Sequence, residues 1–199
     1  MLQFLHLKPE NYLSQKWKNG KGCTLEIAVD SRSPYRWRMS TADLLESGEF
    51  SNFVGYLRHL VLISGAARLT CDDDPPVLLS FPKPFSFSGD AFTLCEVLEP
   101  GQDLNVFCLE GSSRGGCYPT RFRKGEEIHF PLRGDEHFLF LVEGELEVFE
   151  RNTQQQTTLM PKDTACFTRP PNMEFMDIKT VARLDSRAVW VVIHLIEEK

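Results

Sequence analysis

The sequence predicts an all-β fold, because its apolar segments are short, turn residues separate them and an internal repeat organises them. The segments have strand length and are rich in Val, Phe and Thr: LRHLVLI, PVLLSF, FTLCEVL, LNVFCL, HFLFLV, ELEVF, TACF and AVWVVIHLI. Gly, Pro and Asp lie between them, as is typical of strands joined by turns. No window keeps the apolar spacing i, i+3, i+4, i+7 of an amphipathic helix over several turns.

The repeat indicates two copies of one β unit. GYLRHLVLISGAARL and GDEHFLFLVEGELEV both contain a glycine, a bulky strand, a second glycine and a short strand. Three pairs of residues share one interval of 79 positions: Gly55 and Gly134 (134 − 55), Gly65 and Gly144 (144 − 65), and Pro82 and Pro161 (161 − 82). Repeated units of this length favour a tandem arrangement over one large sandwich.

A strand, a glycine turn and a strand, followed by a proline and an aromatic strand, is the pattern of a cupin barrel. The sequence therefore predicts a bicupin, two jelly-roll β-barrels in tandem. We expect residues 1–110 to form the N-terminal barrel and residues 117–199 the C-terminal one. The stretch EGSSRGG, residues 110–116, is predicted to connect them as a flexible loop.

Composition limits the kinds of partner that we expect the protein to bind. The net charge is −6 and Lys and Arg do not cluster, which argues against a nucleic-acid or anionic-membrane surface. No apolar run approaches the ~20 residues of a spanning helix, and the first residues do not read as a signal peptide. The six cysteines have no metal-site spacing, so we expect free thiols and a cytoplasmic protein.

The stretch QKWKNGKGCTLEIA resembles the end of a phosphate-binding loop, but its spacing excludes that function. A P-loop needs G-x-x-x-x-G-K-[ST], whereas Gln15 stands where the first glycine is required and Gly22 follows Lys21. The alternating residues that follow indicate a strand. We interpret the segment as a glycine-rich turn that either closes one end of a pocket through Asn19 or is only a turn.

Histidines give little support for a metal centre. None of the five forms the H-x-H pair that metal-binding cupins use. His129 and His137 flank several charged residues, so a site of two histidines and one carboxylate remains an open alternative. We expect no metal and no cofactor.

Two neighbouring strands carry polar residues in alternation. Thr24 and Glu26 share one strand face, as do Arg38 and Ser40 on the next strand. A hairpin closed by DSRSP would place Glu26 opposite Arg38 and Thr24 opposite Ser40. The shared face is either a solvated surface with one ion pair or the polar wall of a ligand pocket.

Four blocks resemble the HutD/Ves family, in the same order and at similar separations: WKNGKGCTLEIA, WRMSTADLLESGEFSNFVGYLRHLVLISG, FPKPFSFSGD and DLNVF. The resemblance covers about residues 17–108. It implies a bicupin of the bacterial cytoplasm, associated with histidine utilisation or stress-induced expression, that binds a small ligand and has no established catalytic activity. Urocanate and other histidine breakdown products are the ligands it suggests.

The family signature falls on a set of named positions: Trp17, Asn19, Gly20, Gly22, Thr24, Glu26, Trp37, Arg38, Ser40, Phe50, Ser51, Gly55, Arg58, Phe85, Phe87, Asp90, Asp103 and Asn105. The chain departs from the pattern at four positions: Lys21, Val54, Leu57 and Leu104. Lys21 and Val54 are changes that would reshape a pocket mouth.

These residues suit a pocket for a small anion. Arg58 offers a planar fork of donors to a carboxylate, and aromatic rings such as Trp37 and Phe53 could stack on a flat ligand. The predicted ligand-binding set is Asn19, Thr24, Glu26, Trp37, Arg38, Ser40, Arg58, Phe87, Asp90 and Asn105. The alternatives are an ion pair of Arg58 with Asp90 and a core position for Phe85 and Phe87.

Three functions remain open from the sequence. The leading prediction is a metal-free bicupin that binds a small carboxylate and limits or senses flux through histidine degradation. The second is an enzyme, either an isomerase or lyase with Glu26 as general base or a metal oxygenase using His129 and His137. The third is an interaction module that forms a homodimer through AVWVVIHLI.

Overall fold

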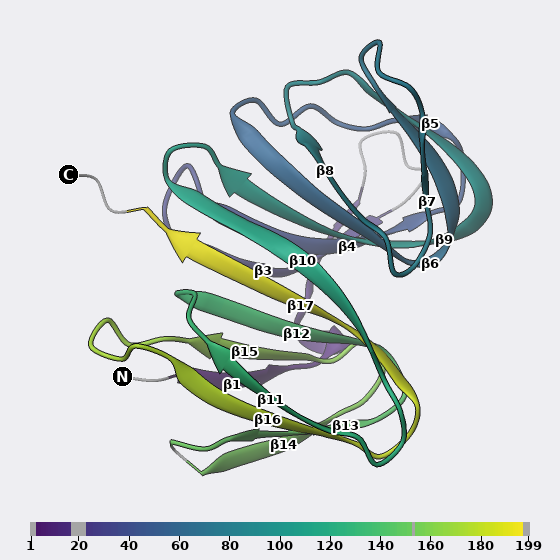
Figure 1. Cartoon of the computed structure of the whole chain (residues 1–199). Helices are drawn as coiled ribbons and strands as arrows, with labels where there is room; N and C mark the ends of the chain where they lie inside the picture. The colour runs from purple at the N-terminus through teal and green to yellow at the C-terminus, as the bar shows by residue number, and fades with distance from the viewer. Residues whose placement is uncertain (1–2, 17–22, 153, 197–199) are drawn as a thin grey trace. The chain divides into compact units, whose positions relative to one another are not determined.

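The computed structural model describes residues 3–16, 23–152 and 154–196, and within them the fold is all-β (Figure 1). One short 3-10 helix, η1 (Pro9–Asn11), is present, and the described residues contain no α-helix. The all-β prediction is therefore confirmed for this part of the chain. Over the same residues, no helix has the length and apolar character needed to cross a membrane.

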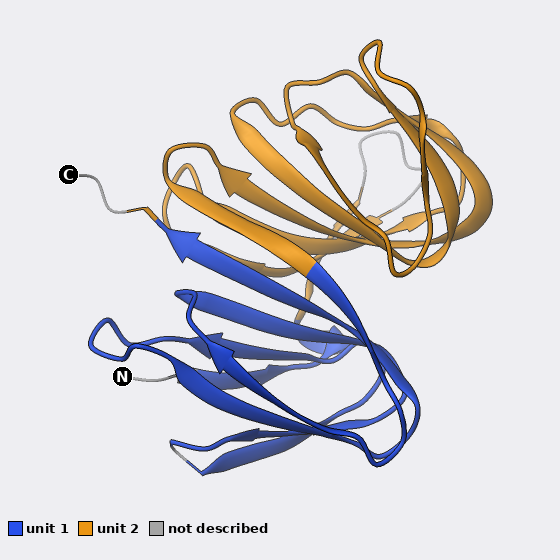
Figure 2. Ribbon diagram, viewed as in Figure 1, with its two compact units in different colours: residues 1–11, 118–195 blue, residues 12–117, 196–199 orange. Residues whose placement is uncertain are grey.

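The chain divides into two compact units, coloured separately in Figure 2. Unit 1 comprises residues 1–11 and 118–195, and unit 2 comprises residues 12–117 and 196–199. The first residues of the chain thus belong with its second half.

Unit 1 is built on two antiparallel sheets. The five-stranded sheet has the order β1 (Gln3–Leu7), β15 (Thr164–Thr168), β12 (Glu136–Glu143), β17 (Ser186–Leu195) and β10 (Ser113–Phe122). The four-stranded sheet has the order β11 (Glu127–Leu132), β16 (Met176–Ala182), β13 (Leu146–Glu150) and β14 (Gln155–Leu159). Alternate residues of both sheets, such as Leu139 and Ile178, fill the core.

Unit 2 contains an eight-stranded sheet. Its main path is β2 (Leu13–Lys16), β3 (Cys23–Val29), β4 (Trp37–Leu44), β9 (Thr93–Leu109), β6 (Tyr56–Cys71) and β7 (Val77–Leu79). Two short strands join it from the side, β5 (Gly48–Glu49) on β9 and β8 (Pro84–Ser88) on β6.

The two longest strands, β6 and β9, are bent where glycines bring their backbones together. The register between them shifts at Leu62, Ser64 and Ala66, which marks a β-bulge. Gly65 has a φ of +73°, and a Cβ there would lie 2.5 Å from the Glu99 carbonyl oxygen. Only glycine fits this position, so the sequence specifies the bend.

The repeated inner glycine has the same conformation in both units. Gly144 in unit 1 follows β12 with a φ of +93°, and a Cβ there would lie 2.1 Å from the Ser186 hydroxyl. The repeat thus has a structural cause, a glycine of positive φ pressed against a neighbouring strand, which lies inside β6 in unit 2 and after β12 in unit 1. The described strands form three sheets with free edges, none of which closes on itself, so the two tandem barrels stay a prediction.

Two local predictions were wrong. Glu26 faces Ser40 and Thr24 faces Ala42, two positions away from the predicted β3–β4 register. A longer loop causes the shift, and Arg36 clamps that loop onto Asp30 through hydrogen bonds of 2.8 and 2.9 Å. The bulge at Ile27 then moves the register back by one position.

The predicted flexible connector is the second error. A turn covers only residues 110–112, and β10 begins at Ser113, where the Ser113 hydroxyl donates to the Arg36 carbonyl at 2.6 Å. This hydrogen bond and the strand conformation of β10 give the Gly- and Ser-rich stretch a defined path.

Candidate functional site

Unit 2 contains a cavity of about 620 Å³ on one face of its sheet. This volume is typical of pockets for small ligands. Strand residues form its floor: Thr24, Arg38, Ser40, Ala42, Arg58, Cys95, Asp103, Asn105 and Phe107. The mouth is formed by Gln15 and Lys16 together with most of residues 44–53.

Strand register explains why polar residues gather on this floor. Arg38 and Arg58 both pair with Phe107, one on each side of β9. Two residues further along β9, Asn105 pairs with Ser40 of β4. Because side chains alternate along a strand, these residues and Asp103 point to the same face.

Arg58 is a buried cation surrounded by rings. Its side-chain carbon Cζ lies 4.8–5.4 Å from the ring centres of four phenylalanines: Phe50, Phe53, Phe87 and Phe107. Nη1 donates to the Ser51 carbonyl at 3.2 Å, while the buried Nε has no partner among the described residues. Burial lowers the pKa of Arg58 to about 10, so the guanidinium stays charged at neutral pH.

Two further buried polar groups lie on β9 beside Arg58. Asp103 is 4% exposed and accepts the Ala42 backbone N–H at 3.0 Å. Burial raises the pKa of Asp103 to about 7, against the opposing charge of Arg58. The side-chain oxygen Oδ1 of Asn105 is buried and has no hydrogen-bond partner within the described part of the chain. Unsatisfied groups of this kind are costly unless something else binds them.

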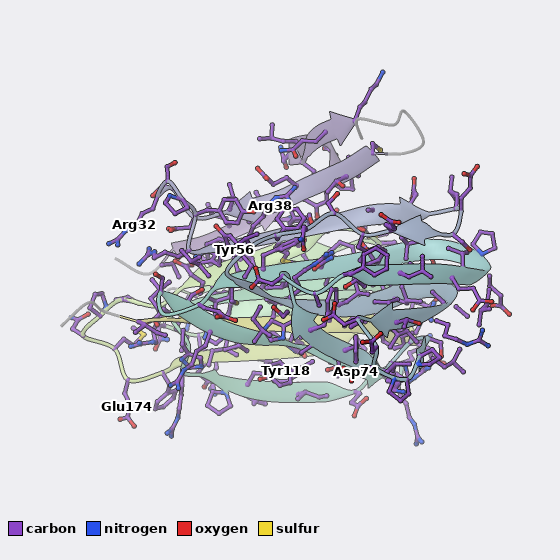
Figure 3. All side chains as sticks on the ribbon, turned by 90° about the horizontal axis from the view of Figure 1, so that it is seen from above. Arg32, Arg38, Tyr56, Asp74, Tyr118 and Glu174 are labelled. Atoms are coloured by element: carbon purple, nitrogen blue, oxygen red, sulfur yellow. The ribbon has the colours of Figure 1, made fainter. Side chains whose placement is uncertain are left out.

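Arg38 has a different environment from Arg58. Its Nε donates to the Glu26 carboxylate at 2.7 Å, and both side chains are largely buried. Figure 3, which draws all the described side chains, labels Arg38. The pair contacts diagonally across β3 and β4, so Glu26 holds Arg38 in place although the two residues are not opposite each other.

The structure brings together about half of the predicted ligand-binding set. Five of its members line the cavity: Thr24, Arg38, Ser40, Arg58 and Asn105. Glu26 holds Arg38, and Phe87 packs under Arg58 and belongs to the apolar core.

Three members of the set lie elsewhere. Trp37 follows the opposite parity on β4 and does not line the cavity. Asp90 is exposed and accepts the Gly55 N–H at 3.3 Å, and the ion pairs of the described residues do not join it to Arg58. Asn19 and its glycine-rich turn lie outside the described residues.

The predicted set omitted some residues of the site. Asp103 was identified only as a signature position, and Phe107 not at all. Alternation along LNVFCL could have found Phe107, because Asn105 and Phe107 are two residues apart on one strand.

His129 and His137 are the histidines that the sequence offered for a metal site. The described residues contain no group of three His, Cys, Asp or Glu side chains that could hold a metal ion. His129 is half exposed on β11 and bonds to Glu127 at 3.0 Å, whereas His137 is fully buried on β12.

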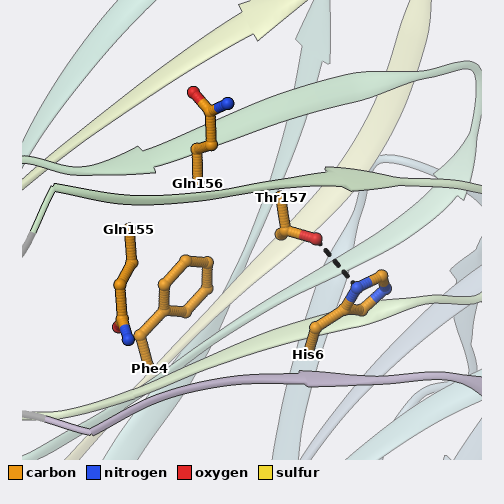
Figure 4. A pocket seen from close by; sticks show the side chains of 5 residues that line it. All are labelled: Phe4, His6, Gln155, Gln156 and Thr157. Carbon is orange, nitrogen blue, oxygen red and sulfur yellow. Dashed lines mark hydrogen bonds between the residues drawn. The ribbon is translucent and has the colours of Figure 1, made fainter.

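A smaller cavity of about 330 Å³ lies in unit 1 and is shown in Figure 4. His6 bridges two side chains beside it, with Nε2 bonded to the buried Asp163 and Nδ1 to the Thr157 hydroxyl, each at 2.8 Å. Asp163 also accepts the Met160 N–H at 3.0 Å. The network ties β1 to β14 and to the turn before β15, so it holds the first strand of the chain in unit 1.

A family model described as HutD matches residues 9–184 of the chain. The chain belongs to the HutD family. The predicted resemblance is therefore confirmed, and the matched region extends well beyond residues 17–108.

Curated relatives agree with this family. The chain is 41% identical over 103 residues to a Pseudomonas putida protein described as an uncharacterized 21.2 kDa protein in the hutC 3′ region, covering 49% of this chain and 54% of that protein. It is 33% identical over 96 residues to Protein Ves of Escherichia fergusonii, covering 45% and 50% of the two chains. The chain thus spans about half the length of the curated relatives it matches.

Solved structures support the fold over nearly the whole chain. A conserved protein of unknown function from Pseudomonas aeruginosa has a TM-score of 0.85 at 26% identity, covering 98% of this chain and 100% of that one. HutD from Pseudomonas fluorescens, solved in a formate condition, has a TM-score of 0.77 at 25% identity, covering 97% and 99%. A cupin 2 conserved barrel protein from Leptotrichia buccalis has a TM-score of 0.57 at 10% identity, covering 93% and 92%. The fold of this HutD-family chain is cupin-like.

Proposed function

We propose that this HutD-family protein binds a small carboxylate in the unit 2 cavity, without a metal, and thereby modulates histidine utilisation. The observation that carries the proposal is the environment of Arg58. A guanidinium buried among four phenyl rings, on a side chain that lines the cavity and has no ion pair among the described residues, is suited to an anion that enters from the cavity.

The ligand class follows from the remaining contacts. Ser40 and Asn105 offer neutral hydrogen bonds on the same floor, and Phe107 offers a ring face. A planar acid such as urocanate, or another histidine-degradation metabolite, combines the charge and shape that such a floor accepts. The names of the relatives support the metabolic setting, since one lies in a hutC region and another is a HutD.

The wider architecture is part of the proposal. The cupin-like fold and the repeated glycine support a bicupin, with cupin-like barrels over most of residues 1–110 and 117–199. The first strand, β1, belongs with the second barrel because it pairs with β15. A cytoplasmic location and a homodimer stay predictions. AVWVVIHLI is not a free edge for dimer pairing, because β17 lies between β12 and β10 in its sheet.

The enzyme alternatives have less support. Glu26 is held by the Arg38 guanidinium at 2.7 Å, which occupies the carboxylate that a general base would need. His129 and His137 belong to no metal-binding cluster among the described residues.

Thermal unfolding with added acids tests the proposal. Wild type and Arg58→Met would be heated with urocanate, histidine, N-formylglutamate and formate, after treatment with a chelator. An acid at 100 times its dissociation constant should stabilise the wild type by about 2.7 kcal/mol and should leave Arg58→Met unchanged. Arg68→Met is the matched control, because Arg68 is a half-exposed arginine that bonds to Glu96 outside the cavity.

Two results would contradict the proposed function. One is stabilisation by an acid that persists in folded Arg58→Met, whatever the result for Arg68→Met. The other is a protein that no acid stabilises but that added Zn²⁺, Mn²⁺ or Fe²⁺ does, which would favour a metal enzyme.

A further inference from the structure

Arg58 and Asp103 are opposite charges that line one cavity without pairing. Both are almost fully buried, at 5% and 4% exposure, and they come from neighbouring strands β6 and β9. No ion pair joins them among the described residues, although the charge of Arg58 acts on Asp103. The strand register separates the two groups, because Asp103 pairs with Leu62, four residues along β6 from Arg58.

The carboxyl of Asp103 is only partly satisfied by the protein. Its Oδ1 accepts the Ala42 N–H, whereas its Oδ2 has no hydrogen bond among the described residues. Nε of Arg58 and Oδ1 of Asn105 also lack partners there. Both of these atoms are shielded from solvent, so the group that the fold leaves open to a ligand in the cavity is Oδ2 of Asp103.

The surroundings of Asp103 favour neither protonation state strongly. Burial raises its pKa to about 7, while Arg58 from β6 and the Ala42 N–H lower it and Asp43 from β4 raises it. Cys95, on the same strand, is a thiol whose own pKa burial raises to about 11, so it is neutral. The other charged residues of the cavity lining are Arg38, Lys16, Glu46 and Glu49.

A bound carboxylate would favour the protonated form of Asp103. It would lie beside Arg58, and its negative charge would disfavour the ionised form of a nearby carboxyl. With a proton on Oδ2, Asp103 instead donates a hydrogen bond to the ligand, and two like charges do not meet in a buried site.

We propose that Asp103 is the second binding group of the cavity, and that an acid enters as its carboxylate together with one proton from solvent. This inference rests on the proposed function. The proton resides on Oδ2 of Asp103 and is donated to one ligand oxygen, while the guanidinium of Arg58 binds the carboxylate. The cavity thus selects small acids that bind as anion plus proton, and its affinity falls as the pH rises.

Calorimetric titration measures this proton directly. Formate and furan-2-acrylate, a planar acid with no titratable ring, would be titrated into the full chain at pH 6, 7 and 8.5, each in two buffers of different ionisation enthalpy. Wild type should take up close to one proton per bound acid at pH 8.5. Its affinity should fall by a factor approaching about ten per pH unit above pH 7.

Asp103→Asn assigns the proton to its residue. The amide keeps an oxygen for the Ala42 N–H, so the variant should bind with no proton uptake and with an affinity that does not change between pH 6 and 8.5. Asp73→Asn is the matched control, because Asp73 is exposed and does not line the cavity. It should behave as wild type.

The outcomes separate this inference from the proposed function. Acid binding with no proton uptake in wild type overturns the role of Asp103 and leaves the proposed function standing, and that measurement holds even if the variant fails to fold. If the affinity of folded Asp103→Asn depends on pH as that of wild type does, the role of Asp103 is also overturned and the proposed function still stands. If neither acid binds wild type at any pH, the proposed function falls, and this inference with it.

Discussion

Arg58 is a buried charge whose close neighbours are rings instead of carboxylates. Burying a cation without an ion pair opposes folding, and the four phenyl faces offset only part of that cost. Residues kept in such an unfavourable setting are candidates for function, because stability alone would select an apolar side chain of similar size.

Arg58→Met tests this interpretation. Methionine fills a similar volume and needs no hydrogen bonds, so the free energy of unfolding should stay within about 1 kcal/mol of wild type, although binding of acids is lost. Chemical denaturation gives the first quantity and calorimetry the second. A loss of more than about 3 kcal/mol would instead make Arg58 a structural residue.

At this scale the sequence predicts which side chains share a face better than it predicts the contacts they make. Thr24 and Ser40 reached the cavity although their register was wrong by two positions, because a shift of two keeps every side chain on its face. Trp37 has the opposite parity to Arg38 and so could not join it. The ring cage of Arg58 was not predictable, since Phe50 and Phe53 lie outside the regular strands.

At the scale of elements, the bend of β6 and β9 is set by a close approach of two backbones. A Cβ on Gly65 would lie within 2.8 Å of three backbone atoms, from Glu99, Pro100 and Gly101. Backbone atoms of a paired strand cannot move aside as a flexible side chain can. The bend therefore depends on this glycine.

Gly65→Ala should destabilise the protein by at least about 2 kcal/mol, because it adds the steric overlap to the strain of a positive φ. Gly48→Ala is the matched control: Gly48 also lies in a strand of unit 2, but a Cβ there meets nothing within 4 Å. It should change stability by less than about 0.5 kcal/mol. Urea denaturation measures the free energy of unfolding of both variants. Equal losses of stability in the two would show that the backbones can move apart.

The sequence located this element through its repeat but not through its shape. An interval of 79 residues marked Gly65 and Gly144 as equivalent, and both adopt positive φ. The spacing of glycines does not predict whether a strand ends or bends at Gly65. That depends on the close approach of Gly101, which lies on a strand distant in sequence. The strand that begins at Ser113 was likewise not predictable from Gly and Ser content, because Ser113 bonds to Arg36, a residue distant in sequence.

At the scale of the whole molecule, a buried histidine links stability to pH. Burial lowers the pKa of His137 to about 4, opposed by the Gly134 backbone and by Asp135 and helped by the charges of His194 and Arg169. The unfolded chain binds this proton near pH 6.5, whereas the folded chain does so only near pH 4. Stability contributed by neutral His137 is therefore fully present above pH 6.5 and is lost as the pH falls toward 4.

Replacement by leucine should remove this sensitivity. Between pH 7.5 and pH 5, wild type should lose about 2 kcal/mol more of its free energy of unfolding than His137→Leu. Denaturation curves at several pH values measure the difference, and both proteins share every other titrating group. Parallel pH profiles would show that His137 takes up its proton in the folded state.

The ring cage of Arg58 has a consequence for conformational entropy. An arginine on the surface loses most of its rotamer freedom when it binds a ligand, and that loss weakens binding. Here the rings and the Ser51 carbonyl already fix the guanidinium in the folded protein. The ordering cost was incurred on folding, so a ligand of only a few atoms can use almost all of the interaction energy that Arg58 offers.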